Sequence, residues 1–328
     1  MSIESDQLQF LAELIEESKF FAGADDLSIE CKHKEIGDTF FDDIVIDGRN
    51  YSYTNKHSYN GELERKRYAK RFTKLALYLS LSDYLHIDLP WGALTGIRPV
   101  KFAYGEGKNW RQVMKNQMRV SDKKLEMVGQ IIENQTGCRQ TAADNCDLFI
   151  GIPFCPTRCS YCSFVSNIIS KEKRLEEYVD ALCREITAAK LMIKNLRSVY
   201  IGGGTPVSLS AELLEKILAA VGNVNCEYTV EAGRPDCIDE NVLSLLKKYG
   251  VTRICVNPQT FNDKTLEIIG RKHTAADIRE KYAMAKKFGF DINMDLIAGL
   301  PGDTPEGFRH TMEQVLSLAP TNITVHTL

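Results

Sequence analysis

Short apolar segments alternate with helical patterns through residues 146–328, and this alternation restricts the fold more than any other feature. The length of the apolar segments is typical of buried strands, and the segments between them place apolar residues at helical spacing. Strand–helix–strand repetition implies parallel strands joined by right-handed crossovers. The expected strands cover 148–152, 198–202, 227–231, 252–256, 291–295 and 322–326. The expected helices cover 172–194, 211–221, 238–248, 264–288 with a break near His273, and 305–318.

Such a run of strands can form an open α/β barrel or a doubly wound sheet. Glycine-rich and polar segments follow several of the expected strands, and barrel sites gather at the carboxyl ends of the strands. We therefore predict an α/β fold in which residues 146–328 form a partial (β/α)6 barrel.

Residues 1–145 have a different pattern and predict a small α+β domain, for which the sequence indicates no role. Two segments, 39–46 and 50–54, are typical of a hairpin whose turn contains Asp47 and Gly48. Helical patterns are expected at 3–21, 61–81, near 109–118 and at 121–135.

The composition is that of a folded protein that is not exported. Of the 328 residues 44% are hydrophobic and 26% charged, which favours a packed core over disorder. The net charge of −3 gives no argument for nucleic-acid binding. The start, MSIESDQLQF, has no basic segment followed by an apolar run, and no stretch approaches the roughly 18 apolar residues of a membrane helix. We expect a cytoplasmic protein without a membrane span, in which the ten cysteines act as thiols and ligands.

Cys155, Cys159 and Cys162 follow the first expected barrel strand with the spacing C-x3-C-x2-C. Three thiolates on a short loop can each bind one iron of a four-iron cluster, which normally takes four cysteines. An iron without a cysteine is open to cofactor or substrate chemistry. A structural zinc, an electron-transfer cluster and chance clustering are the alternatives at this point. The remainder of the barrel sequence favours the cluster with an open iron.

Polar residues lie at or beyond the ends of three other expected strands. Glu231 ends the third, Gln259 follows the fourth and Asp295 ends the fifth. Single residues there often cap helices, but three at equivalent strand ends indicate a ligand site. Arg271 is either a clamp for a carboxylate or a solvated cation at a helix end. The glycines at 202–204 either let backbone approach a ligand or form a plain turn.

The cysteine spacing, with Tyr161 before the third cysteine, resembles that of the radical S-adenosylmethionine (SAM) superfamily over about 148–328. Several segments together resemble the oxygen-independent coproporphyrinogen III oxidase family, in its HemZ-type coproporphyrinogen dehydrogenase branch. These segments are WGALTGIRPVK (91–101), IPFCPTRCSYCSF (152–164), GGGTP (202–206), NPQTFND (257–263), IGRKH (269–273) and MDLIAGLPGDT (294–304).

The resemblance implies a [4Fe–4S] cluster on Cys155, Cys159 and Cys162, with SAM bound at the open iron. It also implies an electron donor such as flavodoxin or ferredoxin. Its implied substrate is the tetrapyrrole coproporphyrinogen III, whose propionates become vinyl groups in haem synthesis without oxygen. The implied SAM contacts are Gly203, Gly204 and Thr205 at the methionine, Arg271 at its carboxylate, Gln259 and Asp295 at the ribose, Glu231 in the same site, and Tyr161, Gly299 and Leu300 at the adenine. Arg158 and Arg234 are candidates for binding the substrate carboxylates.

The chain departs from the family's oxidases in two places. Phe149-Ile150-Gly151 stands where they have Tyr-x-His, and Phe164 stands where they have a fourth cysteine. These departures favour a second hypothesis, a haem-binding chaperone on the same scaffold. A third is a radical SAM enzyme with another substrate, such as RNA or a peptide. The basic helix at Arg65–Lys74 is the one feature for RNA, and such helices are more often solvated faces. Family members continue past residue 328, so we expect a chain truncated before a domain that covers the substrate.

Overall fold

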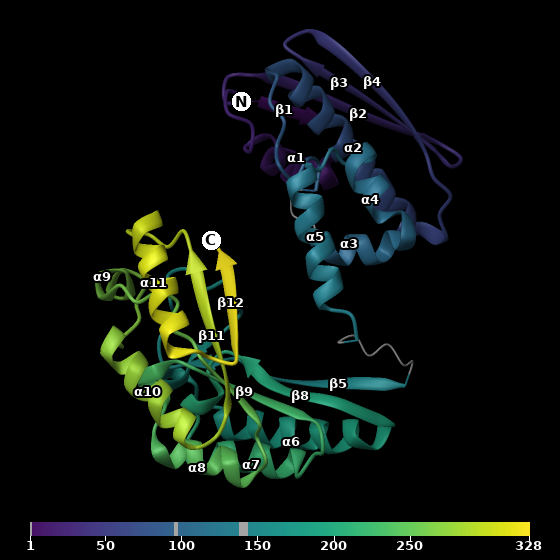
Figure 1. Cartoon of the computed structure of the whole chain (residues 1–328). Coiled ribbons are helices and arrows are strands. Elements are labelled where there is room, and N and C mark those ends of the chain that lie inside the picture. Colours follow the sequence, from purple (N-terminus) through teal and green to yellow (C-terminus); the bar gives the residue numbers. More distant parts are fainter. Residues whose placement is uncertain (1, 95–97, 138–143) are drawn as a thin grey trace. The chain divides into compact units, whose positions relative to one another are not determined.

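The computed structural model describes residues 2–94, 98–137 and 144–328 (Figure 1). Two compact units make up the chain, Met1–Arg139 and Gln140–Leu328, and each has a buried apolar core of its own. The sequence-based division after residue 145 falls at the first strand of the second unit, β5 (Asn145–Ile152). Three residues of the segment at 91–101, Thr95, Gly96 and Ile97, lie outside the described residues.

The second unit is built on a six-stranded parallel sheet of order β12-β11-β10-β9-β8-β5. Because this order follows the sequence without interruption, each crossover leads to the next strand, as in a barrel. The sheet curls, and the helices cover its outer side (Figure 1). The predicted partial (β/α)6 barrel is confirmed. Its strands after β5 are β8 (Asn195–Gly203), β9 (Glu227–Gly233), β10 (Arg253–Val256), β11 (Asp291–Ala298) and β12 (Asn322–Thr327).

The helices of this unit begin and end where turn and capping residues place them. Ser210, Asp239, Asn262, Thr274 and Thr304 each accept a backbone N–H at a helix start. The expected break near His273 is confirmed, since a loop separates α9 from α10. The helices are α6 (Leu175–Met192), α7 (Ala211–Val221), α8 (Glu240–Lys248), α9 (Asp263–Ile268), α10 (Ala275–Lys287) and α11 (Pro305–Leu318).

Short elements that the sequence did not predict hold the loops at one end of the barrel. The two-residue strands β6 (Phe154–Cys155) and β7 (Asn167–Ile168) pair in parallel. They close the loop that carries the cysteines. Single 3-10 turns follow at η4 (Ile169–Lys171), η5 (Pro206–Ser208) and η6 (Pro235–Cys237).

The first unit holds a four-stranded sheet of order β1-β2-β3-β4. The hairpin of β3 (Thr39–Ile46) and β4 (Arg49–Lys56) is confirmed, with positive φ of 45° at Asp47 and 84° at Gly48. The helix predicted from Ile3 is wrong at its start. Ser2–Ser5 form β1, which pairs in parallel with β2 (Ser28–Ile36), a strand the sequence analysis missed. The helix α1 (Leu11–Ser18) begins only after the turn η1 (Leu8–Phe10).

Helices complete this unit, and most basic residues of the longest one pair with carboxylates. These helices are α2 (Gly61–Leu85), α3 (Pro99–Glu106), α4 (Trp110–Gln112) and α5 (Asp122–Asn134). The Arg65 Nη1 lies 2.7 Å from a Glu35 oxygen, and the Arg71 Nη1 lies 2.9 Å from one of Glu106.

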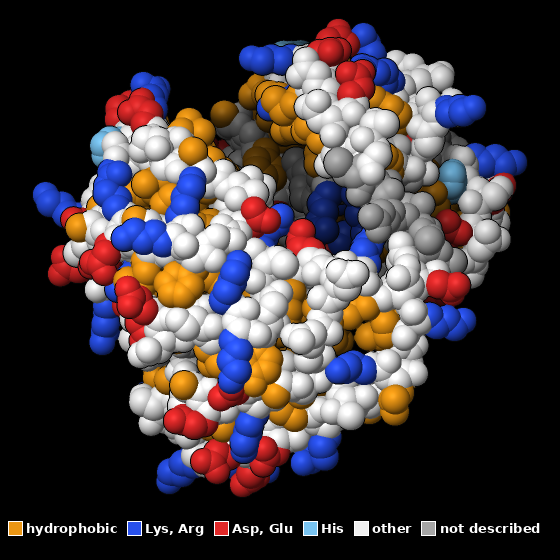
Figure 2. Space-filling model, turned by 60° about the horizontal axis from the view of Figure 1, so that its bottom comes forward, with side chains coloured by type: hydrophobic (Ala, Val, Ile, Leu, Met, Phe, Trp, Pro, Cys, Tyr) orange, Lys and Arg blue, Asp and Glu red, His pale blue; other side chains and the backbone are white. Residues whose placement is uncertain are grey.

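Cations and carboxylates are interspersed on the face shown in Figure 2. No described helix is both long and apolar enough to cross a membrane.

Candidate functional site

A cavity of about 640 Å³ lies inside the curled sheet of the second unit. Its size is that of a pocket for a cofactor or small ligand. Side chains from β8, β9, β10, β11 and β12 and from the cysteine loop line it. The residues predicted from sequence that line it are Cys155, Arg158, Cys159, Tyr161, Cys162, Gly203, Gly204, Thr205, Glu231, Arg234, Gln259, Arg271 and Asp295.

The cysteine loop is anchored to the neighbouring parts of the barrel. The Ser160 N–H donates to the Ile269 carbonyl at 3.2 Å, and the Cys162 N–H donates to the Cys159 carbonyl at 3.1 Å. All three thiols are free and partly exposed. Within the described ranges no three His, Cys, Asp or Glu side chains converge closely enough for one metal ion. An iron–sulfur cluster makes a different demand, because each thiolate binds a separate iron.

The glycine loop after β8 packs directly on the cysteine loop. The Gly204 N–H donates to the Ile152 carbonyl at 2.8 Å, and the Thr205 N–H donates to the Phe154 carbonyl at 2.7 Å. A Cβ at Gly204 would lie 2.4 Å from the Phe154 oxygen, so only glycine allows this approach. The Thr205 hydroxyl in turn lies 3.5 Å from the Cys155 sulfur. The two predicted motifs therefore form one structure.

Glu231 connects the glycine loop to the interior of the barrel. Its carboxylate accepts the Gly203 N–H at 3.1 Å and the Tyr200 hydroxyl at 2.5 Å. Burial raises the pKa of Glu231, and these two hydrogen bonds only partly offset the effect. Tyr200 was not expected at the site. It was recognisable as a polar residue two positions before Gly202 on an otherwise apolar strand, and so on the same face.

Gln259 lies beyond the end of β10 and beside Asp295, which is within β11 and not at its end as the sequence predicted. The Gln259 N–H donates to the Asp295 carbonyl at 3.0 Å, and the Ile297 N–H donates to the Gln259 carbonyl at 3.0 Å. Gln259 holds a positive φ of 67°, which is unusual for a residue with a side chain. Its amide oxygen is buried without a hydrogen-bond partner in the described structure. Strain and an unmet polar group in one residue are typical of functional positions.

Asn293, which the sequence analysis did not select, positions the Asp295 carboxylate. Its Nδ2 donates to the Asp295 Oδ1 at 2.6 Å. Its Oδ1 accepts from the Asn322 side chain at 2.6 Å and from the Thr324 hydroxyl at 3.1 Å. Strand β12 thereby fixes the orientation of the Asn293 amide, and the amide fixes the carboxylate.

Arg271 reaches the cavity with part of its guanidinium uncommitted. Its Nη2 donates to the Tyr161 hydroxyl at 2.9 Å, and its Nη1 lies 3.4 Å from the Gly233 and Asn257 carbonyls. Its Nε is buried without a partner in the part of the chain described. Burial raises the pKa of Tyr161 to about 12, so this phenol stays protonated. The available donor fits the carboxylate clamp expected from the sequence.

Three of the expected contacts lie elsewhere or have other partners. Gly299 and Leu300 are absent from the cavity lining, and Leu300 is buried in the barrel core. A place beside the adenine is therefore not supported for them. Arg234 lines the cavity but is only 3% exposed and pairs with Asp236. Its guanidinium is committed within the protein, whereas Arg158 is exposed on the cysteine loop.

The residues present fit an iron–sulfur cluster and SAM. Three free thiols meet the rim of a cavity that also presents the unpartnered amide oxygen of Gln259 and the Asp295 carboxylate, both suited to hydroxyl donors. The Arg271 guanidinium supplies a cation for an anionic ligand group. The absence of a side chain at Gly204 allows the glycine loop to pack closely on the loop that carries the thiols.

Comparisons with known proteins agree with this site. The family model of the radical SAM superfamily matches residues 149–315. The oxygen-independent coproporphyrinogen-III oxidase-like protein HemZ of Bacillus subtilis is 37% identical over 274 residues, which is 77% of this chain and 55% of HemZ. The haem chaperone HemW of the same organism is 38% identical over 189 residues, which is 55% of this chain and 49% of HemW.

Among solved structures, the coproporphyrinogen III oxidase HemN of Escherichia coli matches with a TM-score of 0.51 and 28% identity, over 55% of this chain and 43% of HemN. The chain spans about half the length of the curated relatives it matches. Members of the matched superfamily use a [4Fe–4S] cluster and SAM. With its family match, its parallel half-barrel and its cysteine loop, the chain belongs to the radical SAM superfamily.

Proposed function

We propose that the second unit carries out radical SAM chemistry in its cavity. The observation that carries the proposal is that three free thiols and the polar groups suited to SAM line one cavity. Cys155, Cys159 and Cys162 would hold a [4Fe–4S] cluster. When bound, the reduced cluster and SAM supply a 5′-deoxyadenosyl radical that removes a hydrogen atom from the substrate.

The chain's own residues bind and orient the cofactor. Arg271 would pair with the methionine carboxylate, and Gln259 and Asp295 would accept hydrogen bonds from the ribose hydroxyls. Glu231 holds the glycine loop by its bond to the Gly203 N–H.

We further propose that the substrate is coproporphyrinogen III, whose propionates each lose a hydrogen atom, CO₂ and one electron to become vinyl groups, the electron passing to a one-electron acceptor. The similarity to HemZ supports this substrate, because it extends over 77% of the chain, well beyond the superfamily match. The similarity to HemN supports it as well. Arg158, which is exposed on the cysteine loop and lines the cavity, would pair with a substrate carboxylate.

A second candidate function is haem binding on the same scaffold. Gly151, at the end of β5, presents no side chain where the family's oxidases have histidine. Phe149 stacks on Tyr200 with ring centroids 5.9 Å apart and has no hydroxyl to donate. The match to the haem chaperone HemW, which covers 55% of this chain, supports it. Haem binding without vinyl formation would be the signature of this alternative.

Product analysis separates the candidates. The chain is reconstituted anaerobically with iron and sulfide, reduced, and incubated with SAM and coproporphyrinogen III. We expect 5′-deoxyadenosine from this chain, with little or no decarboxylation. Products with one or two propionates converted to vinyl, detected by mass spectrometry, would identify coproporphyrinogen III as the substrate. Haem titration of the same preparation tests the alternative. If neither 5′-deoxyadenosine nor vinyl product forms although the cluster is present, the proposed enzyme activity is wrong.

The cysteine assignment has its own control. Replacing Cys155, Cys159 or Cys162 with alanine should abolish the cluster's charge-transfer absorption and its paramagnetic resonance signal. Cys226→Ala is the matched control, because Cys226 is also a free, partly buried thiol but lies outside the cavity lining. If a variant of the first group keeps a full iron content, that cysteine is not a ligand.

A further inference from the structure

Arg234 connects the third barrel strand to the cysteine loop. It follows directly after β9 and is only 3% exposed. Its Nη1 donates to the Thr157 hydroxyl at 2.9 Å and points to the Cys159 sulfur at 3.8 Å. Thr157 and Cys159 belong to the cysteine loop, so the Arg234 side chain contacts both a hydroxyl and a thiol of the expected cluster site.

Asp236 holds the guanidinium in place from the opposite side. The Nε and Nη2 of Arg234 donate to the two Asp236 oxygens at 3.1 and 3.0 Å. The turn η6 keeps the two residues together, since the Cys237 N–H donates to the Arg234 carbonyl at 2.9 Å. Because Asp236 binds one edge of the planar guanidinium, the direction in which Nη1 donates is fixed. That direction is toward Thr157 and Cys159.

The same contacts argue against a direct role in binding substrate. A guanidinium has five N–H donors. Asp236 takes those of Nε and one on Nη2, and Thr157 and Cys159 take those of Nη1. One donor remains, which is too few for the bidentate pairing that makes arginine an effective carboxylate binder.

We propose that Arg234 is a positioning residue for the cluster loop, and that its N–H directed at the Cys159 sulfur raises the reduction potential of a cluster bound there. The inference rests on the cluster site in the proposed function. Hydrogen bonds to ligand sulfurs and nearby positive charge stabilise the reduced cluster, which carries one more negative charge than the oxidised one. Burial of the guanidinium keeps solvent screening of this effect low.

The test compares the cluster's midpoint potential in the full chain and its variants, by anaerobic redox titration followed by electron paramagnetic resonance. In Arg234→Gln the charge and the directed N–H are lost, and we expect a shift to lower potential. A tenfold change in the one-electron equilibrium corresponds to about 59 mV, and we expect at least that. Arg234→Lys keeps the charge but cannot grip Asp236 and reach Cys159 together, so its shift should have the same sign and be smaller.

Arg253→Gln is the matched control. Arg253 lines the same cavity, and its substitution removes the same charge. It pairs with Glu227 at 3.3 Å and, within the described residues, makes no hydrogen bond to the three cysteines of the loop. Its potential should stay close to that of the unaltered chain. Iron content is measured in every sample, because a purely structural role for Arg234 would lower cluster content without moving the potential of the clusters that remain.

The outcomes separate this inference from the function on which it rests. If the unaltered chain takes up no cluster, the proposed function fails and the inference with it. If the chain takes up the cluster, and the clusters of both Arg234 variants have the same midpoint potential as that of the unaltered chain, only the inference is wrong. An equal shift in Arg253→Gln would also contradict it, because the effect would then be one of net charge alone.

Discussion

Gly204 shows how strongly a single position can depend on the absence of a side chain. A Cβ there would lie 2.4 Å from the Phe154 carbonyl oxygen and 2.8 Å from that of Ile152, both backbone atoms of the segment before Cys155. Gly204→Ala should therefore displace the cysteine loop and reduce both iron incorporation and SAM binding, at an overpacking cost of about 1–3 kcal/mol. Equilibrium unfolding and iron analysis would measure this.

Gly105 supplies the control for that change. It lies in α3, and a Cβ there would meet nothing within 4 Å. Gly105→Ala should keep full iron incorporation and leave the stability unchanged or slightly higher, since alanine is a better helix former than glycine. Equal losses in the two variants would show that the Gly204 contact with the cysteine loop is not the cause.

Asp295 depends on Asn293 for its orientation, and this dependence is testable by binding. Asn293→Leu removes the amide that donates to the Asp295 Oδ1 at 2.6 Å. We expect SAM affinity to fall by roughly 2- to 12-fold, the equivalent of one hydrogen bond, with iron content unchanged. Asn241→Leu, at an exposed position of α8, is the control for calorimetric titration with SAM. Unchanged affinity in Asn293→Leu would exclude the positioning role.

The residues that sequence reasoning selected were those whose chemistry shows in the local pattern. Cysteine spacing, the glycine-rich loop and polar residues at strand ends identified part of the cavity lining. Tyr200 and Asp236 were missed because their meaning depends on partners: Tyr200 on Glu231, 31 positions later, and Asp236 on a guanidinium that faces Cys159. Arg234 was selected for its charge, but only the fold shows that this charge faces inward.

At the scale of elements, the start of α10 carries a reciprocal cap. The Thr274 hydroxyl accepts the Asp277 N–H, and the Asp277 carboxylate accepts the Thr274 N–H. Thr274→Ala should lower the free energy of unfolding of the second unit by about 1 kcal/mol. Ser121→Ala is the comparison, because the Ser121 hydroxyl makes no cap hydrogen bond at the start of α5. Denaturant titration followed by circular dichroism would detect the difference, and equal effects would contradict the capping argument.

The barrel elements were predictable because two periodicities agree there. Apolar strand segments and amphipathic helices alternate at regular intervals, and the starts of α7 to α11 each carry a capping residue. The β1 segment was misassigned because Ile3, its one apolar residue, also fits the helical spacing of the residues that follow, and its pairing with β2 is a tertiary contact. The two-residue strands β6 and β7 are too short to leave a periodic signal, although they shape the cysteine loop.

At the scale of the whole molecule, the two units have separate cores, and different measurements report on the stability of each. The cavity and its cysteines belong to the second unit, whereas both tryptophans, Trp91 and Trp110, belong to the first. Tryptophan fluorescence therefore reports on the first unit alone, while ligand-dependent stabilisation reports on the second. This division allows a charge effect in the first unit to be followed without interference from the site.

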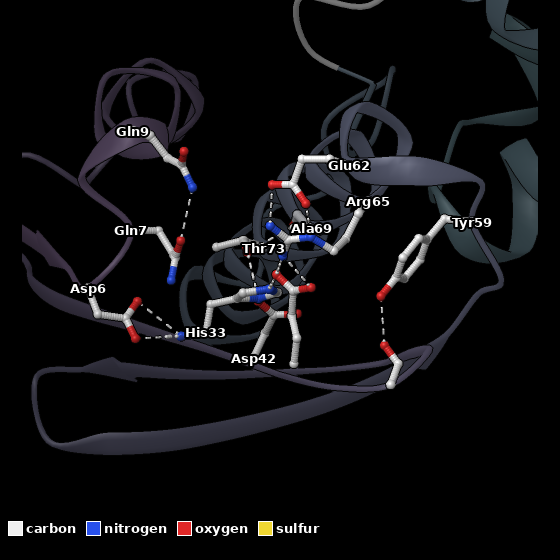
Figure 3. Close-up of polar contacts among 12 residues, drawn as sticks. Asp6, Gln7, Gln9, His33, Asp42, Tyr59, Glu62, Arg65, Ala69 and Thr73 are labelled. Carbon is white, nitrogen blue, oxygen red and sulfur yellow. Dashed lines mark hydrogen bonds and ion pairs between the residues drawn. The ribbon is translucent and has the colours of Figure 1, made fainter.

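That charge effect centres on His33, which lies buried between two carboxylates (Figure 3). Its Nδ1 is 2.6 Å from the Asp42 Oδ1, and its Nε2 is 3.4 Å from a Glu35 oxygen. The Thr73 hydroxyl also donates to Asp42, Arg65 pairs with Glu35, and the Asp6 carboxylate accepts the His33 backbone N–H. Burial acts to lower the pKa of His33, but the hydrogen bonds and charges of Asp42 and Glu35 outweigh it, so the pKa is raised.

The sign of the pH dependence follows from this shift. The folded unit binds the His33 proton more tightly than the unfolded chain, in which the histidine pKa is about 6.5. The resulting stabilisation is complete below that pH and is lost as the pH rises through the higher pKa of the folded state. Tryptophan-monitored urea unfolding should therefore show a free energy that falls as the pH rises above about 6.5. His33→Gln, which cannot titrate, should remove this slope. A slope that persists in His33→Gln, or a stability that rises over the same range, would show that another group governs the first unit.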